Sequence, residues 1–107
     1  MFNTLKKLFS SEKNTSLTEL LAEGALVVDV RTPGEFAGGH VKGAINIPLD
    51  RLASSLSKLS DRDKPLVTCC ASGMRSASAA AVLKRAGYAR VVNGGSWLAV
   101  QARIQSR

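Results

Sequence analysis

The stretch Cys69-Cys70-Ala71-Ser72-Gly73-Met74-Arg75-Ser76 lies between two segments of different character. Residues 66–68 before it form a short apolar run, which predicts a buried strand. Residues 77–85 after it are rich in Ala, Leu, Lys and Arg, which predicts a helix. A cysteine therefore stands where a strand ends and a helix begins. The N–H groups of such a loop converge, and the helix N-terminus adds partial positive charge, so a thiolate is favoured there.

Two more residues of this loop suit an anion-binding site. Arg75 adds a permanent cation, and Gly73 permits a sharp turn. We therefore expect a nucleophilic sulfur held in an anion-binding loop, and we expect the rest of the chain to build and support that loop.

Length and composition predict one globular domain. The chain has 107 residues, 45% of them hydrophobic, which is enough to bury a core without disulfides or metals. It holds no run of about 18 apolar residues, and its N-terminus lacks the apolar stretch of a signal peptide. We therefore expect a cytoplasmic protein, or a piece of a longer one.

The two cysteines, Cys69 and Cys70, are adjacent. Neighbouring Cα atoms lie about 3.8 Å apart, closer than a disulfide prefers. The chain has no C-x-x-C pattern, and its single histidine leaves too few ligands for a structural zinc site. Reactive thiol chemistry remains, and we expect neither a metal nor an organic cofactor.

The chain carries a formal net charge of +7. Such a charge keeps a surface soluble, and it also attracts small anionic substrates or an acidic partner protein. The basic residues are not interleaved with aromatic ones, so we expect no nucleic-acid partner. Residues 1–14 are basic and apolar, and we expect them to form an N-terminal arm that is not a membrane anchor.

Helices and strands alternate along residues 15–107, which we expect to form the single domain. Residues 16–19 have the pattern of a capping box and predict a helix that ends at Gly24. Four segments predict strands, namely residues 25–30, 44–47, 66–68 and 90–93. This alternation indicates an α/β domain with a mostly parallel sheet.

The segments between the strands predict further helices. Thr32 and Glu35 have the spacing of a capping box around Pro33, and Asp50 is expected to cap the next helix. The buried face of that helix is expected to hold Leu52, Leu56 and Leu59. The buried face of the last helix is expected to hold Trp97, Val100 and Ile104.

Four blocks of sequence, taken together, indicate a family. They are Val28-Asp29-Val30-Arg31 with Glu35-Phe36, residues 39–48, residues 70–76, and Asn93-Gly94-Gly95. In this order they resemble the single-domain rhodaneses, a family of sulfurtransferases. The resemblance implies a rhodanese-like domain, whose central, mostly parallel five-stranded sheet is flanked by helices on both faces.

The resemblance also implies a reaction. The cysteine accepts a sulfane sulfur from a small anionic donor such as thiosulfate and holds it as a persulfide. An acceptor such as cyanide, a thiol or a sulfur-carrier protein then takes the sulfur. The displacement at sulfur is the same as in thiol–disulfide exchange, and converging N–H groups of residues 71–76 would stabilise the anionic persulfide.

The loop allows two interpretations of the nucleophile. From Cys70 to Arg75 the pattern is C-x4-R, which resembles the rhodanese loop. From Cys69 to Arg75 it is C-x5-R, which resembles phosphatases and arsenate reductases of the same fold. We favour Cys70 and expect Cys69 to complete the strand as a small buried residue. A resolving role for Cys69, and a non-catalytic binding module, remain as alternatives.

Within the favoured loop, each side chain has a candidate role. Arg75 binds the anionic donor or closes the loop, and we favour the donor. Ser72 and Ser76 donate hydrogen bonds to the persulfide, although Ser76 could instead cap the helix. Met74 is expected at the apolar rim of the pocket, and Ala71 and Gly73 complete the substrate-binding loop.

Three residues outside the loop are expected to support it. Asp29 and Arg31 follow a strand at the sheet edge where α/β proteins place their sites, and we favour an ion pair that holds adjacent loops over a direct role in the pocket. His40 could act as a general base for Cys70, but the resemblance implies that it belongs to a structural turn.

Overall fold

The computed structural model describes residues 17–106 of the chain. The expected N-terminal arm, residues 1–14, and Ser16 of the expected capping box lie outside the described residues. Residues 17–22 form a helix, and Gly24 follows it with a φ of +80°, as the sequence predicts for a helix stop. No helix among residues 17–106 is long and apolar enough to cross a membrane.

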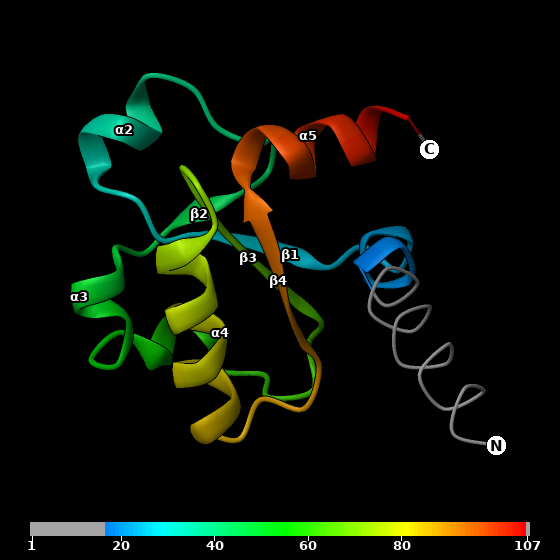
Figure 1. The fold of residues 1–107 in the computed structure, drawn as a ribbon. Helices are drawn as coiled ribbons and strands as arrows, with labels where there is room; N and C mark the ends of the chain where they lie inside the picture. The colour runs from blue at the N-terminus through cyan, green and yellow to red at the C-terminus, as the bar shows by residue number, and fades with distance from the viewer. Residues whose placement is uncertain (1–16, 107) are drawn as a thin grey trace, which may run out of the picture.

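A parallel sheet lies at the centre of the domain (Figure 1). Its strands have the order β2-β1-β3-β4, and each neighbouring pair is parallel. The bounds are Leu26–Asp29 for β1, Ile45–Asn46 for β2, Leu66–Cys70 for β3 and Val91–Ser96 for β4.

The expected number of five strands is wrong for the described residues, which hold four. The fifth strand rested on the resemblance alone, because the residues themselves predicted four apolar strand segments. The α/β class and the parallel pairing are confirmed. The last strand is longer than expected, because Gly94, Gly95 and Ser96 continue it up to the start of the last helix, α5 (Trp97–Gln105).

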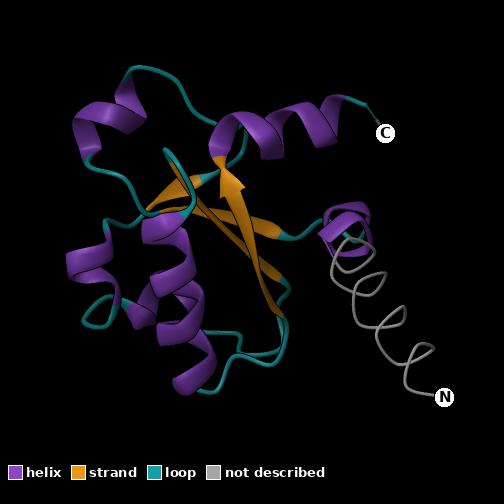
Figure 2. Ribbon diagram, in the orientation of Figure 1, coloured by secondary structure: helices purple, strands orange, loops and turns teal. Residues whose placement is uncertain are grey.

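Helices cover both faces of the sheet, as expected (Figure 2). Along β3 the side chains alternate: Leu66 and Cys70 pack in one apolar layer, and Val67 and Cys69 pack in the other. The first layer includes α3, η1 and α4, and the second includes the helix at 17–22 and α5. The helical bounds are Pro33–Ala37 for α2, Leu49–Leu52 for α3, Leu56–Leu59 for η1, Met74–Arg85 for α4 and Trp97–Gln105 for α5.

The single helix expected after Asp50 is in fact two short pieces, α3 and the 3-10 turn η1. Asp50 is not the N-cap of α3, because α3 already begins at Leu49 and Pro48 occupies the N-cap position. Leu52 and Leu59 are nevertheless buried, as the apolar spacing predicts. In α5, Val100 is fully buried, whereas Trp97 and Ile104 are only partly buried.

Candidate active site

The site begins where β3 ends. Cys70 is the last residue of this strand, and α4 starts at Met74, so only Ala71, Ser72 and Gly73 lie between them. Gly73 has a φ of +104°, a conformation that side chains other than hydrogen rarely allow. A Cβ atom at Gly73 would also lie 3.4 Å from the Cα atom of Gly95 in β4. The chain therefore turns directly from the strand into the helix, as the sequence predicts.

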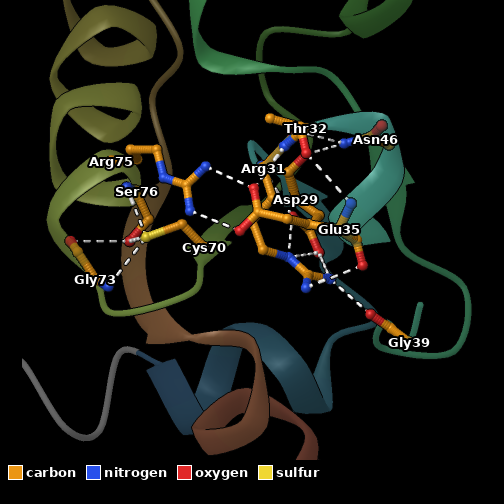
Figure 3. Close-up of polar contacts among 10 residues, drawn as sticks. All are labelled: Asp29, Arg31, Thr32, Glu35, Gly39, Asn46, Cys70, Gly73, Arg75 and Ser76. Carbon is orange, nitrogen blue, oxygen red and sulfur yellow. Dashed lines mark hydrogen bonds and ion pairs between the residues drawn. The ribbon is translucent and has the colours of Figure 1, made fainter. Parts of the chain in front are cut away.

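This turn directs hydrogen-bond donors at the sulfur of Cys70 (Figure 3). The backbone N–H of Gly73 lies 3.0 Å from the sulfur, and that of Ser76 lies 3.3 Å from it. The Cys70 thiol donates to the hydroxyl of Ser76 at 3.6 Å, and the thiolate would accept from the same hydroxyl. Burial by itself would raise the pKa of the Cys70 thiol, but these donors, with the N–H of Ser72, bring its pKa below the ordinary value.

The Ser76 hydroxyl is itself held by the end of β4. It lies 2.6 Å from the Oδ1 atom of Asn93, 3.0 Å from the carbonyl of Gly73 and 3.4 Å from that of Gly95. The same Oδ1 atom accepts the N–H of Gly95 at 2.9 Å. Asn93 therefore fixes the hydroxyl beside the sulfur, and Ser76 is not the helix cap, because Gly73 occupies that position.

Cys69 is in a different environment. It is fully buried in the layer opposite to that of Cys70, and it pairs in register with Asp29 of β1. Burial and, to a smaller degree, the charge of Asp29 raise the pKa of the Cys69 thiol to about 12. The expectation that Cys69 is a buried strand residue is confirmed, and at neutral pH it is a neutral thiol.

Arg75 does not bind loop carbonyls. Its guanidinium group forms two parallel hydrogen bonds with the carboxylate of Glu35 in α2, at 2.8 and 3.0 Å. These bonds lower the pKa of Glu35 to about 2, helped by the backbone N–H of Thr32, so the carboxylate stays ionised at working pH. Glu35 is also the N3 residue of the capping box that the sequence predicts with Thr32.

Asp29 and Arg31 form the ion pair expected from the sequence. Both are buried, and the Nη2 and Nε atoms of Arg31 contact the carboxylate of Asp29 at 2.7 to 3.0 Å. Arg31 also donates to the carbonyls of Glu35 and Gly39, and its guanidinium lies 4.9 Å from the centre of the Trp97 ring. Arg31 thus connects β1 with the α2 segment (Figure 3), and its contact with Trp97 connects both to the start of α5.

His40 and Met74 lie at the outside of the structure. The exposed His40 ring stacks on Phe36 at 3.7 Å, and its Nδ1 atom lies 2.7 Å from the Phe36 carbonyl. These contacts support the structural-turn interpretation of His40. Met74 is 80% exposed at the first position of α4, next to the loop. The loop residues Ala71 and Ser72 are exposed, whereas Cys70 is buried.

Two contributors were not predicted in their observed roles. Glu35 was expected only as a capping residue, and Asn93 only as part of a motif. Each meets its partner across the fold: Glu35 contacts Arg75, and Asn93 contacts Ser76. The carboxyl ends of neighbouring parallel strands lie at one edge of a sheet, which was the signal available for Asn93.

An α/β domain with a cysteine at the end of a parallel strand and N–H donors around its sulfur defines the class of protein. The family model of the rhodanese-like domain matches residues 13–102. The chain therefore belongs to the rhodanese-like domain family. A sulfurtransferase of Allochromatium vinosum is 40% identical over 80 residues, which cover 73% of this chain and 74% of the relative. A thiosulfate sulfurtransferase GlpE of Pseudomonas entomophila is 40% identical over 78 residues, 71% of each chain.

Solved structures are similar as well. A rhodanese with anions from E. coli is 32% identical, with a TM-score of 0.66, and the match covers 70% of this chain and 89% of that one. The human single-domain sulfurtransferase TSTD1 is 32% identical, with a TM-score of 0.64, and the match covers 74% of this chain and 82% of that one. These relatives support a sulfurtransferase of the rhodanese type.

We expect Arg31→Met to destabilise the fold by about 3–5 kcal/mol, because it leaves the buried carboxylate of Asp29 without its partner. Urea unfolding followed by circular dichroism measures the change. Arg90→Met is the matched control, since Arg90 pairs with Glu23 on the exposed surface. A loss no larger than that of the control would contradict a structural role for Arg31.

We expect Ser76→Ala to raise the pKa of Cys70, because the thiolate loses a hydrogen-bond donor while its burial is unchanged. Iodoacetamide alkylation across pH measures it. The rate at neutral pH should fall, and the midpoint of the profile should move to higher pH. Ser78→Ala, on the exposed face of α4, is the control and should leave the profile unchanged. An unshifted Ser76→Ala profile would show that the hydroxyl does not stabilise the thiolate.

Proposed function

We propose that this protein transfers a sulfane sulfur from an anionic donor such as thiosulfate to a thiophilic acceptor, through a persulfide on Cys70. The observation that carries the proposal is the pair of backbone N–H groups, of Gly73 and Ser76, that donate to the Cys70 sulfur. The names of the relatives support the class of reaction. Both cysteines are free, and a reducing compartment such as the cytoplasm would keep them so.

In the first step, the thiolate of Cys70 attacks the outer sulfur of thiosulfate. A sulfur–sulfur bond forms to Cys70, the sulfur–sulfur bond of the donor breaks, and sulfite leaves with the electron pair. The product, Cys–S–S⁻, carries its charge one atom further out than the thiolate. The N–H groups of Ser72 and Gly73, which lower the pKa of the Cys70 thiol, would also stabilise that charge.

In the second step, a nucleophilic acceptor attacks the outer sulfur of the persulfide. For cyanide, a carbon–sulfur bond forms to the outer sulfur, and the sulfur–sulfur bond of the persulfide breaks. The electron pair of that bond stays on Cys70 as the thiolate, and thiocyanate is released. The lowered pKa of Cys70 helps both steps: it raises the thiolate fraction before attack and improves the leaving group afterwards. A small thiol, or the thiol of a sulfur-carrier protein, would accept the outer sulfur in the same way.

The phosphatase or arsenate reductase alternative requires Cys69 as nucleophile. The burial of Cys69 in the opposite layer and its raised pKa of about 12 speak against that role. The same burial speaks against Cys69 as a resolving thiol for Cys70. A purely binding module would not need a cysteine whose pKa is lowered by hydrogen bonds, as that of Cys70 is.

Cys70→Ser should abolish thiocyanate production from thiosulfate and cyanide. It should also abolish the gain of one sulfur atom that intact mass spectrometry detects after thiosulfate alone. The reason is that a serine hydroxyl is not ionised at neutral pH and forms no persulfide.

Cys69→Ser is the matched control. It should keep activity close to that of the wild type, because Cys69 contributes packing only. Loss of activity in Cys69→Ser alone would contradict the assignment and would direct the search to phosphate and arsenate substrates.

A further inference from the structure

The cation of the loop already has an anionic partner. Arg75 presents two guanidinium nitrogens to the two carboxylate oxygens of Glu35, in the parallel geometry that a sulfonate or carboxylate ligand would also use. Both side chains are a little more than one-third exposed, at 37% and 36%. The pair is thus open to solvent, and an anion that enters the site meets it.

Glu35 is held in place for this contact. Its Oε1 atom accepts the N–H of Thr32 at 3.0 Å, and its own N–H donates to the Thr32 hydroxyl at 3.2 Å. Its carbonyl accepts a hydrogen bond from Arg31, which is buried against Asp29. The carboxylate is therefore positioned by the fold of α2 before any ligand binds, and little conformational entropy is lost in the pairing.

The ion pair is also within electrostatic reach of the reacting sulfur. The hydrogen bonds that Arg75 donates to Glu35 are the main cause that raises the pKa of Arg75, and the charge of Cys70 is a further cause. Arg75 directly precedes Ser76, whose N–H and hydroxyl both contact the Cys70 sulfur (Figure 3). An anion bound beside Cys70 would therefore interact with the charges of Arg75 and Glu35 as well.

We propose that Glu35 is a specificity-determining residue of this site. Its carboxylate occupies the two donors of Arg75 that a dianionic sulfur donor needs. A dianion must therefore displace Glu35 or accept repulsion from it, whereas a monoanion meets a smaller penalty. The site selects sulfur donors of lower charge, such as thiosulfonates and persulfides, over thiosulfate. This inference rests on the proposed sulfur transfer and names its donor class.

Two donors of matched chemistry test the inference. Methanethiosulfonate is a monoanion and thiosulfate is a dianion; both give up a sulfane sulfur to Cys70, with methanesulfinate or sulfite leaving with the electron pair. Glu35→Gln removes the charge, and glutamine is equally suited to the N3 position of a capping box, so α2 keeps its cap. We expect kcat/KM for thiosulfate to rise about 5- to 10-fold, and kcat/KM for methanethiosulfonate to rise about twofold or less.

Glu23→Gln is the matched control. Glu23 forms the same kind of exposed ion pair, with Arg90, and lies just before β1, at the end of that strand opposite to Asp29. The Glu23→Gln substitution removes the same charge from the chain, and it should leave kcat/KM unchanged for both thiosulfate and methanethiosulfonate. The gain in Glu35→Gln should shrink as salt rises, because exposed charges are screened. It should disappear in Glu35→Gln/Arg75→Gln, which lacks the freed guanidinium.

Protection of Cys70 from alkylation gives a second measurement that needs no turnover. Sulfate, an unreactive dianion, should protect Cys70 in Glu35→Gln at concentrations about 5- to 10-fold lower than in the wild type. Equal protection, together with an unchanged ratio of the two donors, would overturn the role of Glu35. A wild type that takes sulfur from neither donor would instead overturn the proposed function, while the sulfate measurement would still decide the role of Glu35.

Discussion

The sulfur of Cys70 is surrounded by the N–H groups of the turn that leads into α4, and the rest of the site depends on this contact. The turn exists because β3 ends at Cys70 and the helix starts four residues later at Met74, with Gly73 in a left-handed conformation. Burial alone would keep the thiol neutral, but the converging donors outweigh it. The end of this strand thereby gives a buried thiol a lowered pKa.

The same strand gives its two cysteines opposite properties. Side chains alternate along β3, so Cys69 packs in the apolar layer that includes α5, and Cys70 packs in the apolar layer that includes α4. Cys69 finds apolar neighbours and the carboxylate of Asp29, which raise its pKa, whereas Cys70 finds hydrogen-bond donors. A shift of one residue in the register of β3 would exchange these environments, and the ladder to β1 prevents that shift.

Local patterns were sufficient to predict much of this structure. The strand–loop–helix unit at Cys70, the Thr32–Glu35 cap and the Asp29–Arg31 pair all involve residues close in sequence, where spacing determines contact. The partner of Arg75 is 40 residues away and that of Ser76 is 17 away, and only the packing of the fold brings them together. The break between α3 and η1 was missed because apolar spacing survives it. The fifth strand was predicted from the family resemblance alone, and the described residues do not contain it.

The neighbouring cysteines Cys69 and Cys70 differ in ionisation because of their surroundings. A titration followed by NMR on protein labelled with ¹³Cβ-cysteine measures both thiols in the unaltered chain. We expect Cys70 to ionise below the ordinary pKa of a cysteine, and Cys69 to stay neutral until the pH approaches about 12. Ionisation of Cys69 before Cys70, or of Cys70 only at or above the ordinary pKa, would contradict the roles of burial and hydrogen bonding described above.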